Sequence, residues 1–238
     1  NFIGYGRLDA DIWFLGYEEI SGDENKLSER LKLQPVEDSA EAQRILGCTL
    51  QQFGDENLQG AWRGISEIML RLDGKEITEA NILEYQAKNL GRSDGSTLLC
   101  ELLPIPMSSG SDWPYEDSIP QYTSRESYYE AVKTHRYELI NQLVGQHLPK
   151  IIIAYGQSAW PDYQQVFRRF NLAPNDQFMI GWDANTVVIL CDRFTEGTMD
   201  TKNETLVPLI LEKSLSIDTA KPTGPIPLSK AELARQTK

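Results

Sequence analysis

Four short apolar segments, separated by longer amphipathic stretches, dominate the hydrophobic pattern of the chain. They cover residues 11–16, 97–103, 150–155 and 186–191. Each segment is almost continuously apolar, and this is typical of strands that are covered on both faces. The pattern therefore predicts four buried strands.

Helical periodicity fills the stretches between these strands. Apolar residues recur at three- and four-residue spacing in 62–72, and the segment 124–147 opens with Ser124, a residue type favoured at helix N-caps. Further helices are predicted over 158–170 and 204–215. Alternating strands and helices predict an α/β fold, a three-layer α/β/α sandwich with a central, mostly parallel four-stranded sheet.

The loops that follow the four strands form the candidate site, because ligands of open α/β sheets bind beyond the carboxyl ends of the strands. The segment 104–115 is too long and too rich in turn residues to be a simple connection. The four loops contribute acids, a cation, a hydroxyl and aromatic rings, namely Tyr17, Glu18, Glu19, Trp113, Ser158, Arg193 and Phe194.

Three glutamates carry the chemistry of this rim. Glu18 and Glu19 follow the first strand, where they can stabilise a developing positive charge and orient water, or else begin a helix as favourable acidic residues. Glu101 lies inside the second apolar strand, where a charged side chain must be paired or must serve a ligand. It is therefore either the partner of an arginine such as Arg63 or an acceptor in a pocket.

The other candidates also have two interpretations each. Trp113 can stack on a planar ligand or can pack on its own loop as part of a lid. Arg193 and Phe194 can reach phosphates or a ring. The turn 156–158 resembles a phosphate-binding turn but lacks the Walker glycine–lysine pattern. The basic residues of 124–147 alternate with glutamates, and this favours a solvated face of mixed charge.

Composition narrows the classes of function. The 238 residues suit one domain, 1–217, followed by a proline-containing tail, 218–238. Lys+Arg number 23 against 35 Asp+Glu, and the formal charge of -12 argues against a protein that coats nucleic acid, although a local basic face remains compatible with it. No apolar run approaches the roughly 20 residues that cross a bilayer.

Cysteine and histidine counts exclude several kinds of site. Three widely spaced cysteines cannot form a disulfide framework or a four-cysteine zinc or iron–sulfur site within the chain. The only two histidines, His135 and His147, fall in one predicted helix, and this argues against a histidine zinc site or a Ser–His–Asp triad. We expect a reduced, cytoplasmic protein that is monomeric and has no cofactor and no membrane partner.

The order of elements resembles the uracil-DNA glycosylase superfamily over roughly residues 10–212. The resemblance is carried by the strand 10–16 with its polar loop, by 98–103, and above all by Pro-Lys-Ile-Ile-Ile-Ala-Tyr-Gly-Gln-Ser-Ala at 149–159. None of the catalytic motifs of that family is intact. The resemblance implies DNA as the partner, and the cysteine count excludes the iron–sulfur branch.

The resemblance also implies roles for individual residues. Glu18 falls where family members with a Gly-Gln-Asp-Pro-Tyr loop carry the catalytic aspartate, with Glu19 as its neighbour or substitute. Glu101 falls where an asparagine reads the uracil edge. The resemblance further implies that Tyr17 or Trp113 stacks on the base. Residues close to the DNA are then Ser158, Arg193 and Phe194.

The departures from the family pattern predict a substrate other than uracil. The family's His-Pro-Ser loop is replaced by 192–195, so Arg193 would have to stabilise the departing base. A carboxylate at Glu101 would face O4 of uracil unfavourably but would accept from an exocyclic amine such as cytosine N4. We therefore expect a monofunctional DNA glycosylase that flips out a modified cytosine-type base and hydrolyses its N-glycosidic bond, with a role in defence against phage DNA.

Two alternatives remain open at this stage. One is a non-catalytic module on the same fold that binds nucleic acid or a nucleotide. The other is a small-molecule hydrolase that uses Glu18 and Glu19 with a divalent metal. Fold alone does not separate these functions.

Overall fold

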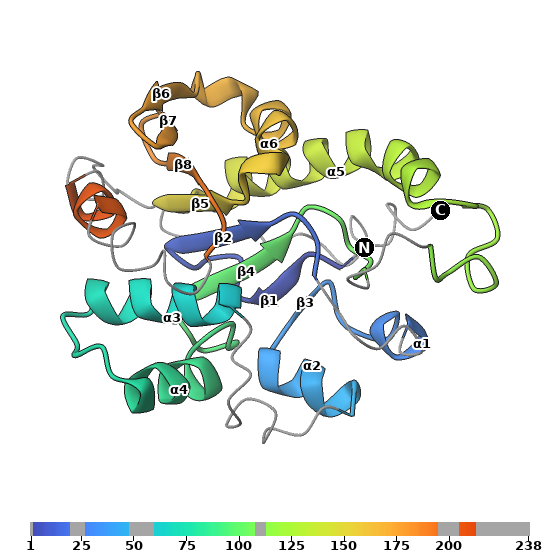
Figure 1. Ribbon diagram of the computed structural model, residues 1–238, viewed down its shortest axis with the longest axis horizontal. Coiled ribbons are helices and arrows are strands. Elements are labelled where there is room, and N and C mark those ends of the chain that lie inside the picture. Colours follow the sequence, from blue (N-terminus) through green and yellow to red (C-terminus); the bar gives the residue numbers. More distant parts are fainter. Residues whose placement is uncertain (1, 20–26, 48–59, 108–112, 195–204, 213–238) are drawn as a thin grey trace.

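A single mixed β-sheet forms the centre of the protein (Figure 1). The computed structural model describes residues 2–19, 27–47, 60–107, 113–194 and 205–212. Within these residues the sheet has eight strands in the order β3-β1-β4-β2-β5-β8-β7-β6. The strands are β1 Gly4–Gly6, β2 Ile12–Gly16, β3 Val36–Glu37, β4 Thr97–Glu101, β5 Ile151–Tyr155, β6 Ala173–Asn175, β7 Phe178–Trp182 and β8 Val187–Cys191.

The four predicted strands are confirmed as the central strands β4, β2, β5 and β8, which are parallel to one another. The predicted four-stranded, mostly parallel sheet is not confirmed, because the sheet is larger and mixed: β1 adds antiparallel to β4 and parallel to β3, while β7 adds antiparallel to β8 and β6 to β7. Of these added strands, β7 is a continuous apolar run, Phe-Met-Ile-Gly-Trp, that the sequence analysis missed, whereas β1 and β6 carry no such run. β1 reads Gly-Tyr-Gly, and all three residues of β6 are exposed.

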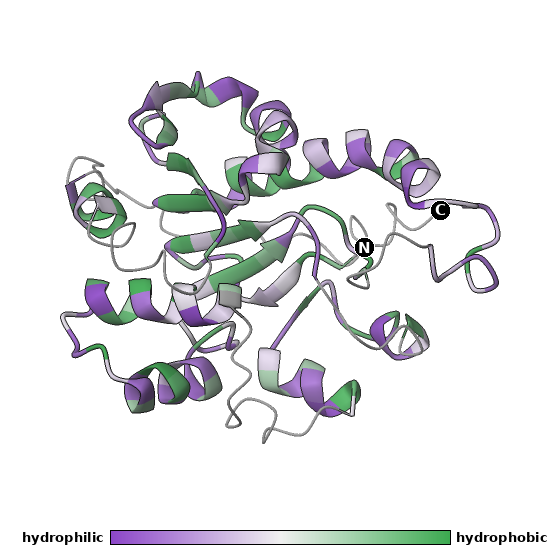
Figure 2. Ribbon diagram, in the orientation of Figure 1, coloured by the Kyte–Doolittle hydropathy of each residue, from purple (hydrophilic) through white to green (hydrophobic). Residues whose placement is uncertain are grey.

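Helices cover both faces of the sheet (Figure 1). The described helices are α1 Leu27–Arg30, α2 Ser39–Ile45, α3 Gly60–Leu72, α4 Glu79–Lys88, α5 Arg125–His147, α6 Trp160–Val166 and the helical residues 205–212. Phe14 points to the face that packs against α3 and α4, whereas its neighbours Trp13 and Leu15 pack against α5 and α6. The apolar strands therefore lie between two helical layers (Figure 2).

The predicted helices are largely confirmed. The stretch 62–72 lies in α3, and Ser124 caps α5, with its side chain accepting from the amide of Ser127. The predicted helix 158–170 is instead broken into α6 between two 3-10 turns, and Pro161 in the first turn of α6 fixes where that helix starts. Of the predicted helix 204–215, the described residues 205–212 are helical.

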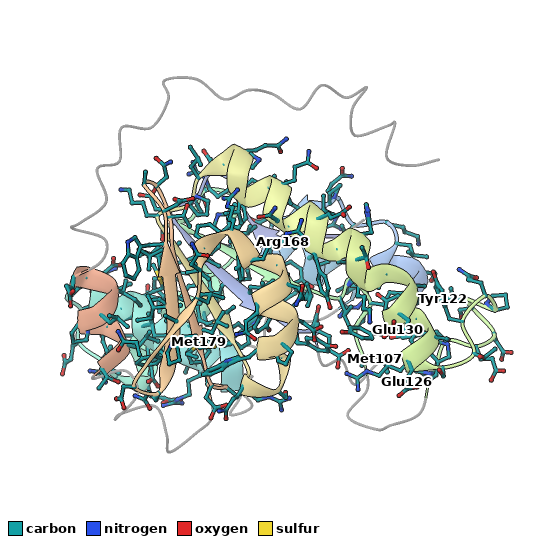
Figure 3. The ribbon with its side chains drawn as sticks, turned by 90° about the horizontal axis from the view of Figure 1, so that it is seen from above. Met107, Tyr122, Glu126, Glu130, Arg168 and Met179 are labelled. Atoms are coloured by element: carbon teal, nitrogen blue, oxygen red, sulfur yellow. The ribbon has the colours of Figure 1, made fainter. Side chains whose placement is uncertain are left out.

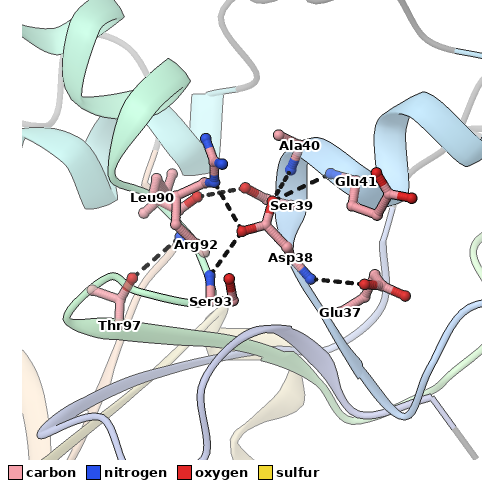
Figure 4. A network of polar contacts seen from close by, with 10 residues as sticks. Glu37, Asp38, Ser39, Ala40, Glu41, Leu90, Arg92, Ser93 and Thr97 are labelled. Carbon is pink, nitrogen blue, oxygen red and sulfur yellow. Dashed lines mark hydrogen bonds and ion pairs between the residues drawn. The ribbon is translucent and has the colours of Figure 1, made fainter.

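A polar network beside β3 and the start of β4 fixes α2 to the chain before β4 (Figure 4). One carboxylate oxygen of Asp38 caps α2 by accepting from the amides of Ala40 and Glu41 at 3.0 and 3.2 Å. The other accepts from Nε of Arg92 at 3.0 Å and from the amide of Ser93 at 2.9 Å. Burial raises the pKa of Asp38, but these donors outweigh it and lower the pKa to about 2.

The structure also describes two of the three cysteines and bears on membrane spanning. Cys100 and Cys191 are both buried in the core. Among the described residues, no helix combines the length and apolar character needed to span a bilayer. Cys48 and the tail 218–238 lie outside the described residues.

Candidate functional site

A cavity of about 570 Å³ lies at the carboxyl ends of the four central parallel strands. All of the predicted site residues except Trp113 line it. Its volume falls within the range of about 300–1,000 Å³ that is usual for ligand pockets. Loops remote in sequence therefore meet where the topology of the sheet predicts a binding site. The pocket also contains residues that the sequence did not single out, notably Trp62 and Tyr155, as well as Arg125, which had been assigned to a solvated face.

Glu18 is held by an ion pair. Its Oε1 accepts from the guanidinium of Arg125, the first residue of α5, and its side chain is only 13% exposed. Its Oε2 is buried and has no hydrogen-bond partner among the described residues. Burial raises the pKa of Glu18, and this effect outweighs the lowering by Arg125 and Arg193, so the pKa lies above its usual value but is raised less than that of a carboxyl without cations. Glu18 is therefore a paired carboxylate with one oxygen left for a ligand or water.

Glu19 has a different environment from its neighbour. Arg30 binds both of its carboxylate oxygens at 2.7 and 2.8 Å, and the hydroxyl of Tyr5 donates to it at 2.9 Å. Its main-chain oxygen accepts from the amide of Met107 at 2.9 Å. Neither Glu18 nor Glu19 is helical, and the residues that would continue such a helix, 20–26, lie outside the described residues. Glu19 anchors the loop structurally, and Glu18 is the acid available to a ligand.

Glu101 ends β4 and has no arginine on its carboxyl group. Arg63, the partner considered from the sequence, instead pairs with Glu67 on its own helix at 3.1 Å. Arg136 approaches from α5, but it donates to the main-chain oxygens of Glu101 and Leu102, both at 2.8 Å. Oε2 of Glu101 is buried without a hydrogen-bond partner among the described residues. The interpretation as half of a structural ion pair is therefore wrong for Glu101.

The proton affinity of Glu101 follows from this environment. Burial raises the pKa of its carboxyl well above the usual range, and the nearby carboxylates of Glu19 and Glu18 raise it further, against a smaller lowering by Arg136. Glu101 therefore keeps its proton at pH values at which an exposed glutamate has lost it. The raised pKa favours the protonated form of the side chain over the ionised acceptor that the sequence analysis assumes.

Gly16 makes room for two polar groups beneath the pocket. A Cβ at this position would lie 2.2 Å from Oε2 of Glu101 and 2.7 Å from the hydroxyl of Tyr155. The ring of Tyr155 lies 5.1 Å from that of Phe194, which is buried at 4% exposure. Phe194 thus forms a wall of the pocket. Sequence reasoning missed Tyr155 because it reads as part of the apolar strand β5. Its place at the carboxyl end of that strand is nevertheless a signal, since ligands of open α/β sheets bind there.

Trp113 packs against its own loop and against α5. Its ring meets Tyr115 of the loop edge-on at 5.3 Å between centroids and stacks on Tyr128 of α5 at 5.2 Å. Trp113 does not line the pocket, so the packing interpretation agrees with the structure better than stacking on a ligand does. The tryptophan that lines the pocket is Trp62 of α3, and Tyr17 also lines it, with its ring 6.4 Å from that of Tyr129.

Positive charge around the pocket is sparse. Among the described residues, its cationic lining groups are Arg125, which pairs with Glu18, and the exposed Arg193. The helix that supplies Arg125 also carries the exposed Glu126 and Glu130 (Figure 3). Arg136, on the same helix, is 2% exposed, so the predicted solvated face is wrong for this residue. Any nucleic acid at this site would meet few cations.

A metal site is not formed by the acids that the sequence suggested for it. Glu18 and Glu19 are each engaged by a different arginine, so they do not act as a pair of ligands. Within the part of the chain that the structure describes, no group of three or more His, Cys, Asp or Glu side chains is placed to hold a metal ion.

The site is thus a pocket with aromatic walls and two carboxyl groups in unequal environments. Glu18 is paired with Arg125, whereas Oε2 of Glu101 is buried without a hydrogen-bond partner among the described residues. No protein-family model, curated protein or solved structure matches the chain significantly, so the interpretation of the pocket rests on this geometry.

Proposed function

We propose that the protein hydrolyses the N-glycosidic bond of a base that is flipped out of DNA into this pocket. The observation that carries the proposal is the presence of Glu18 and Glu101 in one cavity, with only Glu18 held by a cation. Carboxyl groups whose environments separate their pKa values mark the division of labour in many hydrolases, glycosidases among them.

Glu18 supplies the charge that this reaction needs. Cleavage of a glycosyl bond passes through an oxocarbenium-like sugar, which a nearby carboxylate stabilises. At about 4 Å and an effective dielectric constant of about 20, that attraction is worth about 4 kcal/mol. Such a contribution corresponds to about a thousandfold in rate. The unpaired Oε2 of Glu18 is the acceptor that orients the attacking water.

The walls of the pocket suit a planar heterocycle. Tyr17, Trp62, Tyr155 and Phe194 line it, and enzymes that act on extruded bases hold them by stacking and by hydrogen bonds to their edges. We propose a modified cytosine-type base as the substrate, since a cavity of about 570 Å³ has room for a substituent on the pyrimidine ring. The role in defence against phage DNA rests on the superfamily resemblance and stays a prediction.

The mouth of the pocket offers a small contact for the DNA backbone. Arg193 and Ser158 are both exposed and both line the cavity. A contact with one or two phosphates is compatible with a chain whose formal charge is -12, whereas a long duplex footprint is not. We therefore place the phosphate contact at Arg193.

The test is abasic-site formation on DNA panels that carry uracil, cytosine or modified cytosines, read by alkaline cleavage with chelator present. We expect product from a modified-cytosine panel and a loss of about a thousandfold in Glu18→Gln. Glu126→Gln removes the same charge from an exposed site and should leave the rate unchanged. Absence of product from every panel would contradict the proposal.

The sparse positive rim favours one alternative, a module that binds a nucleotide without cleaving it. That function predicts ligand binding that survives Glu18→Gln and no abasic product on any panel. A metal-dependent hydrolase predicts instead that chelator abolishes turnover. The abasic-site assay, repeated without chelator and accompanied by a measurement of nucleotide binding, therefore separates the three functions.

A further inference from the structure

We infer that Glu101 acts in the pocket as a neutral carboxylic acid and selects a heterocycle whose edge offers a hydrogen-bond acceptor beside a donor. The inference rests on the proposed function in taking the ligand to be a nucleobase. It deepens that function by assigning the chemical feature that the pocket recognises.

The carboxyl group of Glu101 has an unsatisfied oxygen at the pocket. Oε2 of Glu101 is buried with no hydrogen-bond partner among the described residues, and the side chain borders a cavity. The guanidinium of Arg136 donates from Nε and Nη2 to main-chain oxygens, and its buried Nη1 has no hydrogen-bond partner among the described residues, so none of its nitrogens binds Oε2 of Glu101. A buried polar atom without a partner costs free energy of about 1–3 kcal/mol, and a ligand that supplies the partner recovers it.

The charges around Glu101 favour its protonated form. Glu18 and Glu19, after β2, present two carboxylates to it, and Arg136 of α5 is the opposing cation. The other titratable groups that interact with it are Cys100 on its own strand, Tyr155 at the end of β5 and Tyr163 on α6. None of these three is a cation. Burial and two like charges therefore raise the pKa of Glu101 and keep its proton in place.

A neutral carboxyl group has a hydrogen-bonding pattern of its own. It presents one O–H donor beside one C=O acceptor, whereas a carboxylate presents acceptors alone. An edge such as cytosine N3 with its 4-amino group fits both atoms at once. The edge formed by uracil O4 and N3–H fits equally well, so the proton on Glu101 removes the repulsion that an ionised side chain would impose. Discrimination between these bases then depends on other walls of the pocket.

A binding experiment with free bases tests this without any cleavage. The full chain is titrated calorimetrically with cytosine, uracil and N4,N4-dimethylcytosine at pH 7, as wild type, Glu101→Gln and Glu101→Ala. Glutamine keeps a neutral donor beside an acceptor, so Glu101→Gln should bind cytosine within about threefold of wild type. Wild type should bind the dimethylated base about tenfold more weakly because one hydrogen bond is lost, and Glu101→Ala should bind cytosine at least tenfold more weakly because both are lost.

A direct readout of the proton accompanies the titrations. The infrared difference spectrum between wild type and Glu101→Gln at pH 7 should contain the carbonyl band of a protonated carboxyl. A carboxylate band in its place would overturn the inference, as would Glu101→Gln binding as poorly as Glu101→Ala, or no saturable binding of either natural base.

The outcomes also separate this inference from the proposed function. Free-base binding with the expected variant pattern, but without abasic sites on any DNA, would retain the inference and reject the hydrolase. Abasic-site formation together with an ionised Glu101 would retain the hydrolase and reject the inference.

Discussion

The guanidinium of Arg125 donates to Glu18 from a position 107 residues further along the chain. This contact joins the start of α5 to the loop after β2, and it brings a cation to the carboxylate that the proposed reaction uses. The charge state of the candidate catalytic acid therefore depends on a residue of a different element.

Removing that cation should shift the pH dependence of the reaction. Arg125 lowers the pKa of Glu18, so Arg125→Met should raise it, and activity that requires the carboxylate should be lost at a higher pH than in wild type. The measurement is the acid limb of the pH–rate profile for abasic-site formation. Lys88→Met, which removes an exposed cation of α4, is the control and should leave the limb in place. An unmoved limb in Arg125→Met would contradict this role.

Glu19 should matter for stability more than for chemistry. Glu19→Gln leaves Arg30, whose side chain is 12% exposed, without its counter-charge, and breaking such a buried pair costs about 3 kcal/mol. Urea unfolding should show a correspondingly lower midpoint with an unchanged slope. Glu41→Gln breaks the exposed pair with Arg44 and should cost less than about 1 kcal/mol. Equal costs for the two variants would show that Glu19 is not an anchor.

Asp38 should make stability depend on pH in the acid range. Its pKa in the folded protein, about 2, lies below the usual 3.8, so its contribution is present above about pH 4 and is lost as the pH falls towards 2. The shift corresponds to about 2 kcal/mol. Asp38→Asn keeps a good N-cap residue and removes the charge. The stability difference from wild type, measured by urea titration, should therefore be constant near neutrality and should vanish near pH 2.

Gly16→Ala should fill the space under the pocket. The added Cβ would meet Glu101 and Tyr155 well inside van der Waals distance, so one or both side chains must move into the cavity. Binding of free cytosine should weaken at least tenfold. Gly145→Ala introduces the same methyl group in α5, next only to the end of the Arg169 side chain, and should leave binding unchanged. Retention of wild-type affinity in Gly16→Ala would place the ligand elsewhere.

DNA binding should depend only weakly on salt. With one or two phosphate contacts, the slope of log K against log salt concentration should be roughly −1 to −2. Arg193→Gln should reduce its magnitude by about 1. Fluorescence anisotropy with a labelled oligonucleotide between low and physiological salt measures both slopes. A steep slope would mean that cations outside the pocket dominate the contact.

The sequence predicted the centre of the fold because that part is encoded locally. Continuous apolar runs mark strands that are covered on both faces, and β2 and β5 are of this kind. The flanking strand β1, with two glycines in three residues, pairs with β4 only through contacts between distant segments. No local pattern announces such a strand.

The site shows the same division between local and distant information. Glu18 and Glu101 could be found because each acid follows or ends a buried strand. Their different environments could not be found, since Arg125 lies far away in sequence and Arg136 binds main-chain oxygens, for which sequence offers no signal. Glu19 looked equivalent to Glu18 because its partner Arg30 becomes visible only in three dimensions.

One helix supports both carboxyl groups of the pocket. Arg125 and Arg136 are eleven residues apart on α5, about three helical turns, so they project from the same face of the helix. The first grips the side chain of Glu18, and the second grips the backbone that carries Glu101. A rigid-body shift of α5 would displace Glu18 and the backbone of Glu101 together, so the helix couples the positions of the two acids. A displacement of α5 that starts far from the pocket would then change the positions of both carboxyl groups at once.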